Sequence, residues 1–187
     1  EIFLPVAFEP ELHFTGFQGL ASHGAAIGII IALYIWSRKV SKKNILWILD
    51  RVVVTVASGA FFIRMGNLMN SEIIGEPTTV PWAFIFKYVD QLPRHPTQVY
   101  EGLAYLSIFI ILAFLFWKKG WSDRQGGVFG LFLILLFGFR FCIEFMKENQ
   151  VNFEDSMTLN MGQWLSIPFV LIGSYFLVKS KKLSANG

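Results

Sequence analysis

Residues 126–146 read GGVFGLFLILLFGFRFCIEFM, an apolar run of membrane-spanning length that carries two charged residues near its end. Arg140 and Glu144 are four residues apart, so a helix would place both side chains on one face. A charged residue inside a hydrocarbon segment costs about 2.5 to 3.5 kcal/mol on insertion scales, and such residues usually face a bundle interior or a wet cavity. The pair therefore indicates a functional site, with a structural ion pair as the alternative.

The composition of the chain places it in a membrane. The chain is 54% hydrophobic with 20 Phe and 6 Trp, and its mean hydropathy of +0.52 is too high for an ordinary soluble domain. Five stretches approach the length of about 20 residues that a bilayer requires: 20–37, 45–63, 98–117, 126–146 and 162–179. The sequence thus predicts an all-α, polytopic membrane helix bundle with five transmembrane helices, in a single domain covering residues 1–187.

Basic residues predict the orientation, because cytoplasmic loops of membrane proteins collect Lys and Arg. Three basic clusters follow the first, third and last predicted spans: Arg38, Lys39, Lys42 and Lys43; Lys118, Lys119 and Arg124; Lys179, Lys181 and Lys182. With five alternating spans, all three clusters fall on one side, so we expect this side and the C-terminus to be cytoplasmic. Residues 1–19, 64–97 and 147–161 are then external. The net charge of +3 is thus a signal for topology, and no basic stripe indicates nucleic acid.

Three residues within the predicted spans have simple structural interpretations. Asp50 and Arg51, close to the cytoplasmic end of the second span, can pair or extend to the interface. The single cysteine, Cys142, excludes an internal disulfide and a multi-cysteine metal site, and we expect neither a metal nor a cofactor. Cys142 lies about 200° around a helix from Arg140, so we interpret it as a packing residue that points away from the charged face.

The polar residues concentrate in the outer half of the predicted topology: His23, Arg64, Asn67, Glu72, Arg94, His95, Glu101, Arg140 and Glu144. At a rise of ~1.5 Å per residue, Arg140 lies ~21 Å along its helix and Arg64 ~28 Å along its own, in a hydrocarbon core ~30 Å thick. Two arginines at this depth indicate recognition of an anionic headgroup, since guanidinium groups bind phosphate oxygens in a bidentate manner. The alternative is that each arginine only extends to the interface.

The longest external stretch, 64–97, is rich in Gly and Pro, which shape irregular backbone, and long ordered loops tend to be functional. It leads into Arg94-His95-Pro96-Thr97-Gln98-Val99-Tyr100-Glu101, in which Pro96 suits the first turn of a helix. Taken alone, His95 indicates a hydrogen-bonded network at this helix entry. His23, at the outer end of the first span, alone indicates local hydrogen bonding.

Five motifs occur in order along the chain: Ser22-His23-Gly24; Arg64-Met65-Gly66-Asn67 continuing through Asn70-Ser71-Glu72 to Gly75; Arg94 to Glu101; Phe139-Arg140 with Glu144; and Met161-Gly162-Gln163. Together they resemble the prolipoprotein diacylglyceryl transferase family, and they cover nearly all 187 residues. The resemblance implies a multi-pass enzyme of the bacterial cytoplasmic membrane, with its active region toward the outer leaflet. Such an enzyme moves diacylglycerol from phosphatidylglycerol to the lipobox cysteine of a prolipoprotein signal peptide.

The resemblance also implies site residues. His23, Arg64, Asn67, Glu72, Gly75, Arg140 and Glu144 match positions that the family uses for its active region, and His95 joins them as a candidate substrate-binding residue. Two departures matter. The family commonly has a tyrosine four residues before the arginine of its Phe-Arg motif, where this chain has Leu136. The family also has two further transmembrane helices upstream, so we expect this chain to begin after them.

The chemistry of the implied reaction suits these residue types. A thiol with a pKa of ~8.5 is mostly protonated at neutral pH, so the acceptor cysteine needs a base, for which His23 is the candidate. Arg64 and Arg140 would stabilise the departing phosphate, Glu144 would orient Arg140, and Asn67 would donate a further hydrogen bond.

Two other classes of function remain open from the sequence. A transporter or flippase for an anionic lipid or solute would place charges in both halves of the membrane, whereas this chain concentrates them in the outer half. A structural membrane subunit would explain the aromatic residues but not the clustered arginines.

Overall fold

The computed structural model describes the backbone of residues 20–147 and 159–180, and side chains from residue 28 onward. These residues form two compact units, one ending at Lys43 and one beginning at Asn44, and each is described by itself. The first unit contains α1 (Leu20–Trp36), followed by a π-helical turn over Ser37–Ser41. The hydroxyl of Ser37 donates a hydrogen bond of 2.8 Å to the carbonyl of Lys43, which holds this turn closed.

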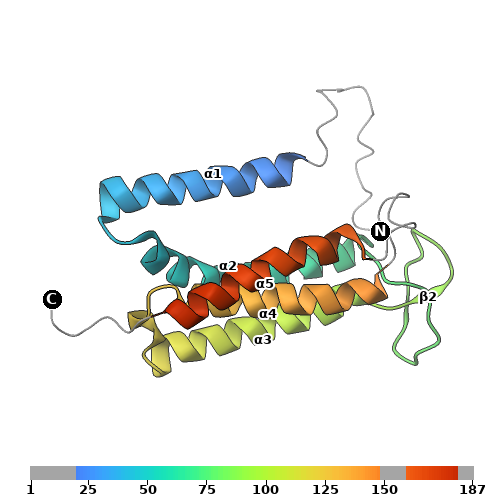
Figure 1. Cartoon of the computed structure of the whole chain (residues 1–187). Coiled ribbons are helices and arrows are strands. Elements are labelled where there is room, and N and C mark those ends of the chain that lie inside the picture. The colour runs from blue at the N-terminus through green and yellow to red at the C-terminus, as the bar shows by residue number, and fades with distance from the viewer. Residues whose placement is uncertain (1–19, 148–158, 181–187) are drawn as a thin grey trace. The chain divides into compact units, whose positions relative to one another are not determined.

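The second unit is a helix bundle that also carries a short hairpin (Figure 1). Its helices are α2 (Ile45–Met69), α3 (Thr97–Lys118), α4 (Gly127–Ile143) and α5 (Met161–Lys179). Single 3₁₀ turns cover Trp121–Asp123, before α4, and Glu144–Met146, which directly continues it. Strands β1 (Phe84–Ile85) and β2 (Pro93–Arg94) pair antiparallel, with Phe84 opposite Arg94.

Four of the described helices are long and apolar enough to cross a membrane: α2, α3, α4 with its 3₁₀ turn, and α5. The prediction of an all-α multi-pass membrane protein is therefore confirmed for these four spans. With 17 residues, α1 is at the lower limit of the usual length, and its crossing of the membrane stays a prediction. Helix α2 continues to Met69, six residues beyond the predicted end of its span, so Arg64 and Asn67 are helical.

Apolar side chains from three helices form the core of the second unit. Its buried members are Val53, Val54, Ala57, Tyr105, Ile108, Leu112, Val128, Phe132 and Leu133. Helices α4 and α5 approach closely at a pair of glycines, because a Cβ on Gly130 would come within 2.6 Å of the Gly173 carbonyl oxygen. Small residues that let backbones approach are the usual packing device between helices in lipid. Elsewhere the outer surface is apolar, as at Phe62 and Leu171, which suits contact with lipid chains.

The start of α4 is fixed by a carboxylate from α2. Asp50 is buried, and its two oxygens accept hydrogen bonds from the backbone N–H groups of Gly126 (2.6 Å) and Phe129 (2.8 Å). A carboxylate there satisfies donors that a helix N-terminus leaves free and interacts favourably with the helix dipole. Arg51 instead lies over the ring of Trp47, 3.4 Å from its centroid. The structural interpretation of both residues therefore agrees with their contacts, although each has a different partner.

One structural interpretation was wrong in part. Cys142 is exposed on α4, so the expectation that it is a packing residue fails, although it lies on a different face from the buried Glu144. The helix places it on the surface of the bundle because its neighbours in sequence, Ile143 and Glu144, take the inward-facing positions.

Candidate functional site

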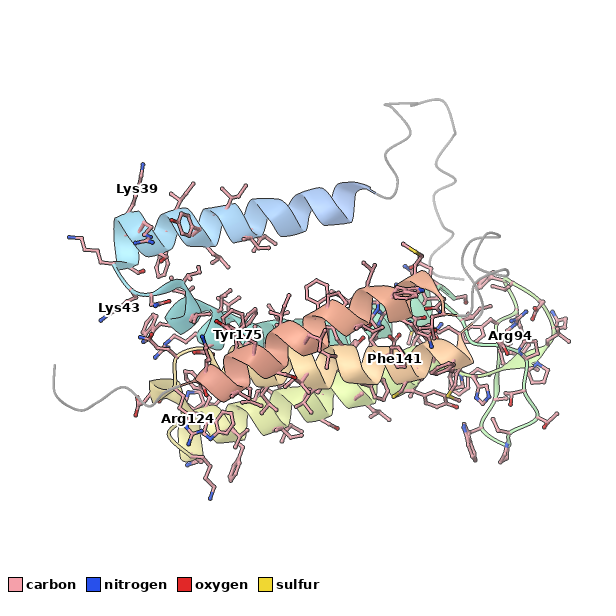
Figure 2. All side chains as sticks on the ribbon, viewed as in Figure 1. Lys39, Lys43, Arg94, Arg124, Phe141 and Tyr175 are labelled. Carbon is pink, nitrogen blue, oxygen red and sulfur yellow. The ribbon has the colours of Figure 1, made fainter. Side chains whose placement is uncertain are left out.

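Charged residues from three helices meet at the end of the bundle where α4 ends. Figure 2 shows Phe141 and Arg94 toward this end, whereas Arg124 and Tyr175 lie toward the opposite end. The chain segment after α2 runs back across this end, where residue 75 pairs in an antiparallel bridge with residue 147. The N–H group of Glu76 also donates to the carbonyl of Met146 at 3.1 Å.

Arg64 lies in the last turns of α2 and is nearly buried. Its Nε atom is 3.1 Å from Oε2 of Glu101 on α3, and the exposed fractions of the two side chains are 11% and 0%. Its Nη1 group donates a hydrogen bond of 3.2 Å to Oδ1 of Asn67, one helical turn later. Its guanidinium also lies 5.9 Å from the ring centroid of Tyr105. Arg64 is thus held from three sides, which argues against the alternative of a side chain that only extends to the interface.

Glu101 and Lys147 connect Arg64 on α2 with Glu144 at the end of α4. The Nζ atom of Lys147 lies 3.0 Å from Oε1 of Glu101 and 3.5 Å from Oε1 of Glu144. The Glu101 oxygen also accepts a hydrogen bond from the hydroxyl of Tyr105 at 3.2 Å. Only 2% of the Lys147 side chain is exposed, so these carboxylates and the ammonium group interact away from water. Charges buried in this way need such partners, because an unpaired buried charge is strongly destabilising.

Arg140 and Glu144 lie on one face of α4 and its 3₁₀ extension, as predicted. The Nη2 atom of Arg140 is 3.6 Å from Oε1 of Glu144, and among the described residues no other acidic side chain pairs with this arginine. The exposed fraction of the Arg140 side chain is 37%, whereas that of Glu144 is 8%. Arg140 is therefore anchored at one nitrogen and open to a ligand at the others.

Helix α5 completes the surroundings of Glu144. Asn160 caps this helix and also places Nδ2 3.5 Å from Oε2 of Glu144. Gly162 follows, and a Cβ at its position would come within 2.6 Å of Cδ of Glu144. The absence of a side chain at residue 162 is what lets α5 approach the carboxylate. This contact gives a physical reason for the Met161-Gly162-Gln163 motif.

The segment after α2 holds a second group of predicted site residues. Nδ2 of Asn67 donates 2.9 Å to Oε2 of Glu72, and the backbone carbonyl of Glu72 accepts a 2.6 Å hydrogen bond from the side chain of Gln98. The next residue, Ile73, has a left-handed backbone with φ of 56°. A β-branched residue rarely adopts this conformation, and strained residues that the surroundings hold in place cluster at functional sites.

Gly75 and His95 lie beside this segment. The N–H group of Gly75 donates a hydrogen bond of 3.1 Å to the carbonyl of His95. The carbonyl of Gly75 accepts a hydrogen bond of 3.1 Å from Nη1 of Arg94. A Cβ on Gly75 would come within 2.6 Å of the His95 carbonyl oxygen, so only glycine fits here. Nδ1 of His95 lies 3.3 Å from the hydroxyl of Tyr100, a hydrogen-bonded network at the helix entry.

His23 belongs to α1 in the first unit, whereas the site residues described above all belong to the second unit. Its predicted role stays a prediction. The sequence interpretation also missed two members of the charged network. Glu101 was noted as an outer polar residue but not assigned to the site, and Lys147 was assigned to an external loop. The signal for Lys147 was its spacing of three residues from Glu144, which places the two on one side of a helical turn.

An apolar groove of 260 Å³ runs between α4 and α5 close to Arg140. Its lining residues are Gly138, Phe141, Ser166, Ile167, Val170 and Leu171. A second groove, of 350 Å³, lies between the end of α2 and the hairpin and is lined by Leu68, Met69, Ser71 and residues 84–88.

Taken together, the fold and the site define a multi-pass α-helical membrane protein with a buried network of cations and carboxylates at one end of its bundle. The profile of the prolipoprotein diacylglyceryl transferase family matches residues 9–179. The chain belongs to this family.

Named relatives agree with this assignment. Proteins named phosphatidylglycerol–prolipoprotein diacylglyceryl transferase are 52% identical in Bacteroides fragilis, over 95% of this chain and 64% of the relative. The corresponding protein of Chloroherpeton thalassium is 47% identical, over 88% of this chain and 61% of the relative. That of Tolumonas auensis is 44% identical, over 89% and 64%. The chain spans slightly less than two thirds of the length of these curated relatives.

Proposed function

We propose that the protein transfers the diacylglyceryl group of phosphatidylglycerol to the lipobox cysteine of a prolipoprotein signal peptide. The observation that carries this proposal is the continuous ion-pair network from Arg64 through Glu101, Lys147 and Glu144 to Arg140, in a chain of this family. The network holds two guanidinium groups at the same end of the bundle, which supports the proposal that both act on one lipid phosphate.

The reaction is a substitution at carbon. The substrate thiolate attacks the sp³ glyceryl carbon that bears the phosphate, a C–S bond forms, and the C–O bond breaks with its electron pair going to oxygen. Glycerol phosphate leaves, and the thiol proton passes to His23, the proposed base. The nucleophile comes from the substrate, so Cys142 takes no part.

The arginines supply the catalytic advantage. As the C–O bond breaks, negative charge grows on the departing phosphate oxygens, and fixed guanidinium groups stabilise this state more than the bound lipid. Arg64 is held by Glu101 and Asn67, so little reorganisation of this arginine accompanies the reaction, and Arg140 is oriented by its contact with Glu144. Glu144 thus acts as a positioning residue for Arg140.

The remaining predicted residues shape the binding site. Both functions of the Asn67 amide are engaged, one with Arg64 and one with Glu72, which favours a role in orienting Arg64 over direct donation to lipid. Gly75 and His95 would hold the segment after α2 against the start of α3, so their contribution to substrate binding acts through this backbone.

The apolar groove between α4 and α5 suits one acyl chain of the lipid whose phosphate lies at Arg140, because Phe141 lines the groove and is adjacent in sequence. We propose that this end of the bundle faces the outer leaflet of the bacterial cytoplasmic membrane. The basic residues near the other end, including Lys118, Lys119 and Arg124, support that orientation.

The proposal is tested with the full-length protein in detergent. The protein is incubated with headgroup-labelled phosphatidylglycerol and a lipobox peptide, and the products are a lipid-modified cysteine and free glycerol phosphate. Appearance of both supports the transferase. Absence of both, with movement of phosphatidylglycerol between leaflets of reconstituted vesicles, would support the transporter class instead.

A further inference from the structure

The charged network contains a third cation for which the proposed function gives no role. Lys147 follows the 3₁₀ turn that ends α4, and its Nζ atom contacts two buried carboxylates, Glu101 at 3.0 Å and Glu144 at 3.5 Å. These carboxylates are the partners of the two arginines, Arg64 and Arg140 respectively. Lys147 is therefore the group that links the two arginine–carboxylate pairs.

The backbone holds Lys147 in this position. Residue 147 forms an antiparallel bridge with Gly75, and its N–H group donates 3.4 Å to the carbonyl of Glu144. The neighbouring carbonyl, that of Met146, accepts from the N–H group of Glu76 at 3.1 Å. The lysine thus enters the network from a segment tied to the strained stretch after α2, and the side chain is 2% exposed.

The balance of charge gives Lys147 a specific task. The groups joined by ion pairs are three cations and two carboxylates, which leaves one positive charge in excess among them. The carboxylate of Glu72 is not ion-paired with Arg64, because the Asn67 amide lies between them. Without Lys147 the two arginines would only neutralise the two carboxylates, and an entering phosphodiester would find no net positive charge. Buried charges interact strongly because water does not screen them, so this difference acts directly on an anionic ligand.

We infer that Lys147 is a positioning residue that neutralises Glu101 and Glu144 together, so that Arg64 and Arg140 keep donor groups for the phosphate of an anionic phospholipid. This inference rests on the proposed function for the identity of the lipid. With Lys147 in place, the site binds one negatively charged group, which a phosphodiester supplies. Lys147 itself, enclosed by the two carboxylates, does not touch the reacting atoms.

The test compares four forms of the full-length protein: wild type, Lys147→Met, Lys147→Arg, and the double variant Lys147→Met with Glu101→Gln. Lys118→Met, at the far end of α3, is the matched control for loss of a lysine. Binding of short-chain phosphatidylglycerol, with phosphatidylcholine as the comparison lipid, is measured separately from transfer. Binding therefore reports on Lys147 even if the wild-type protein shows no transfer, an outcome that would sink the transferase proposal alone.

We expect Lys147→Met to weaken phosphatidylglycerol binding and to lower kcat/KM about a hundredfold, because two buried carboxylates lose a partner. The kcat/KM of Lys147→Arg should stay within about tenfold of the wild-type value, since arginine keeps the positive charge. The kcat/KM of the double variant should be at least about tenfold higher than that of Lys147→Met, because one uncompensated carboxylate is removed. A role in packing alone would give no such recovery.

Two results would overturn the inference. One is a Lys147→Met protein whose phosphatidylglycerol binding and transfer stay within about threefold of wild type. The other is a double variant no better than Lys147→Met. Where Lys147→Met fails to accumulate in membranes, the double variant decides: selective binding of phosphatidylglycerol supports the inference, and loss of that selectivity overturns it.

Discussion

The Nε atom of Arg64 on α2 lies 3.1 Å from Oε2 of Glu101 on α3, and none of that carboxylate side chain is exposed. The glutamate is shared, because its other oxygen contacts Lys147. Residues 64, 101 and 147 are far apart in the sequence. The shared Glu101 carboxylate therefore fixes the relative positions of three chain segments and also neutralises its own buried charge. The activity proposed for the site depends on this arrangement staying rigid.

Replacing Arg140 by lysine tests the need for a planar donor. Arg140→Lys keeps the charge but cannot present parallel N–H groups to a phosphate, so transfer should fall about a hundredfold or more. The measurement is kcat/KM for transfer to a lipobox peptide. Arg124→Lys, in which the exchanged arginine lies over the ring of Trp121 near the opposite end, is the matched control and should retain wild-type activity. A wild-type rate for Arg140→Lys would refute the role of the guanidinium.

His23→Ala tests the proposed base. Removal of a general base slows the chemical step by about a hundredfold to ten-thousandfold and leaves lipid binding nearly intact. Turnover and phosphatidylglycerol binding are therefore measured on the same preparation, with His13→Ala as the control for loss of an imidazole. Weaker lipid binding in His23→Ala would reassign the histidine to headgroup recognition.

Two glycines provide a matched pair. A Cβ on Gly162 would come within 2.6 Å of Cδ of Glu144, whereas one on Gly59 meets no atom within 4 Å. Gly162→Ala should displace Glu144, release Arg140 from its anchor and lower transfer at least about tenfold, since misplaced catalytic groups are costly. Gly59→Ala should leave transfer close to wild type. Equal activities in the two variants would show that the position of Glu144 does not matter.

Acid should loosen the β1–β2 hairpin. Hydrogen bonds from the side chain of Arg94 hold the pKa of Asp90 below its ordinary value of 3.8, with help from the N–H group of Leu92. A lowered pKa stabilises the folded hairpin above 3.8, and this contribution is lost as the pH falls through the folded-state value.

Amide hydrogen exchange across residues 84–94 measures this effect. Protection in the wild-type hairpin should drop at pH values below 3.8. Asp90→Asn should already be less protected at neutral pH and should respond less to acid. Identical pH profiles for the two proteins would contradict the assignment of the shift to Asp90.

Much of the fold was predictable because membrane spans are long, apolar and continuous. The apolar run of residues 126–146 predicts a membrane span by itself, and the spacing of Arg140 and Glu144 predicts that both lie on one helix face. The end of α2 was misplaced because Arg64, Gly66 and Asn67 resemble loop residues, whereas the helix continues through them and the buried Glu101 is the partner of Arg64.

The site was predictable only in part. The arginines were identifiable because charge is rare in apolar runs, but Lys147 follows its span and resembles an ordinary loop lysine. What marks it is a bridge to Gly75 and contacts with Glu101, which join residues distant in the sequence. Its spacing of three residues from Glu144 is a local signal for one of its contacts, whereas the pairing with residues 75 and 101 has no local pattern in the sequence.

A double-mutant cycle on Arg64 and Arg140 tests the central claim most directly. If both guanidinium groups act on one phosphate within one network, the loss of kcat/KM in Arg64→Lys with Arg140→Lys should be smaller than the product of the single losses, by about tenfold or more. If the product of the two single losses agrees with the loss in the double variant to within about twofold, the two arginines act independently. That result would contradict a shared site.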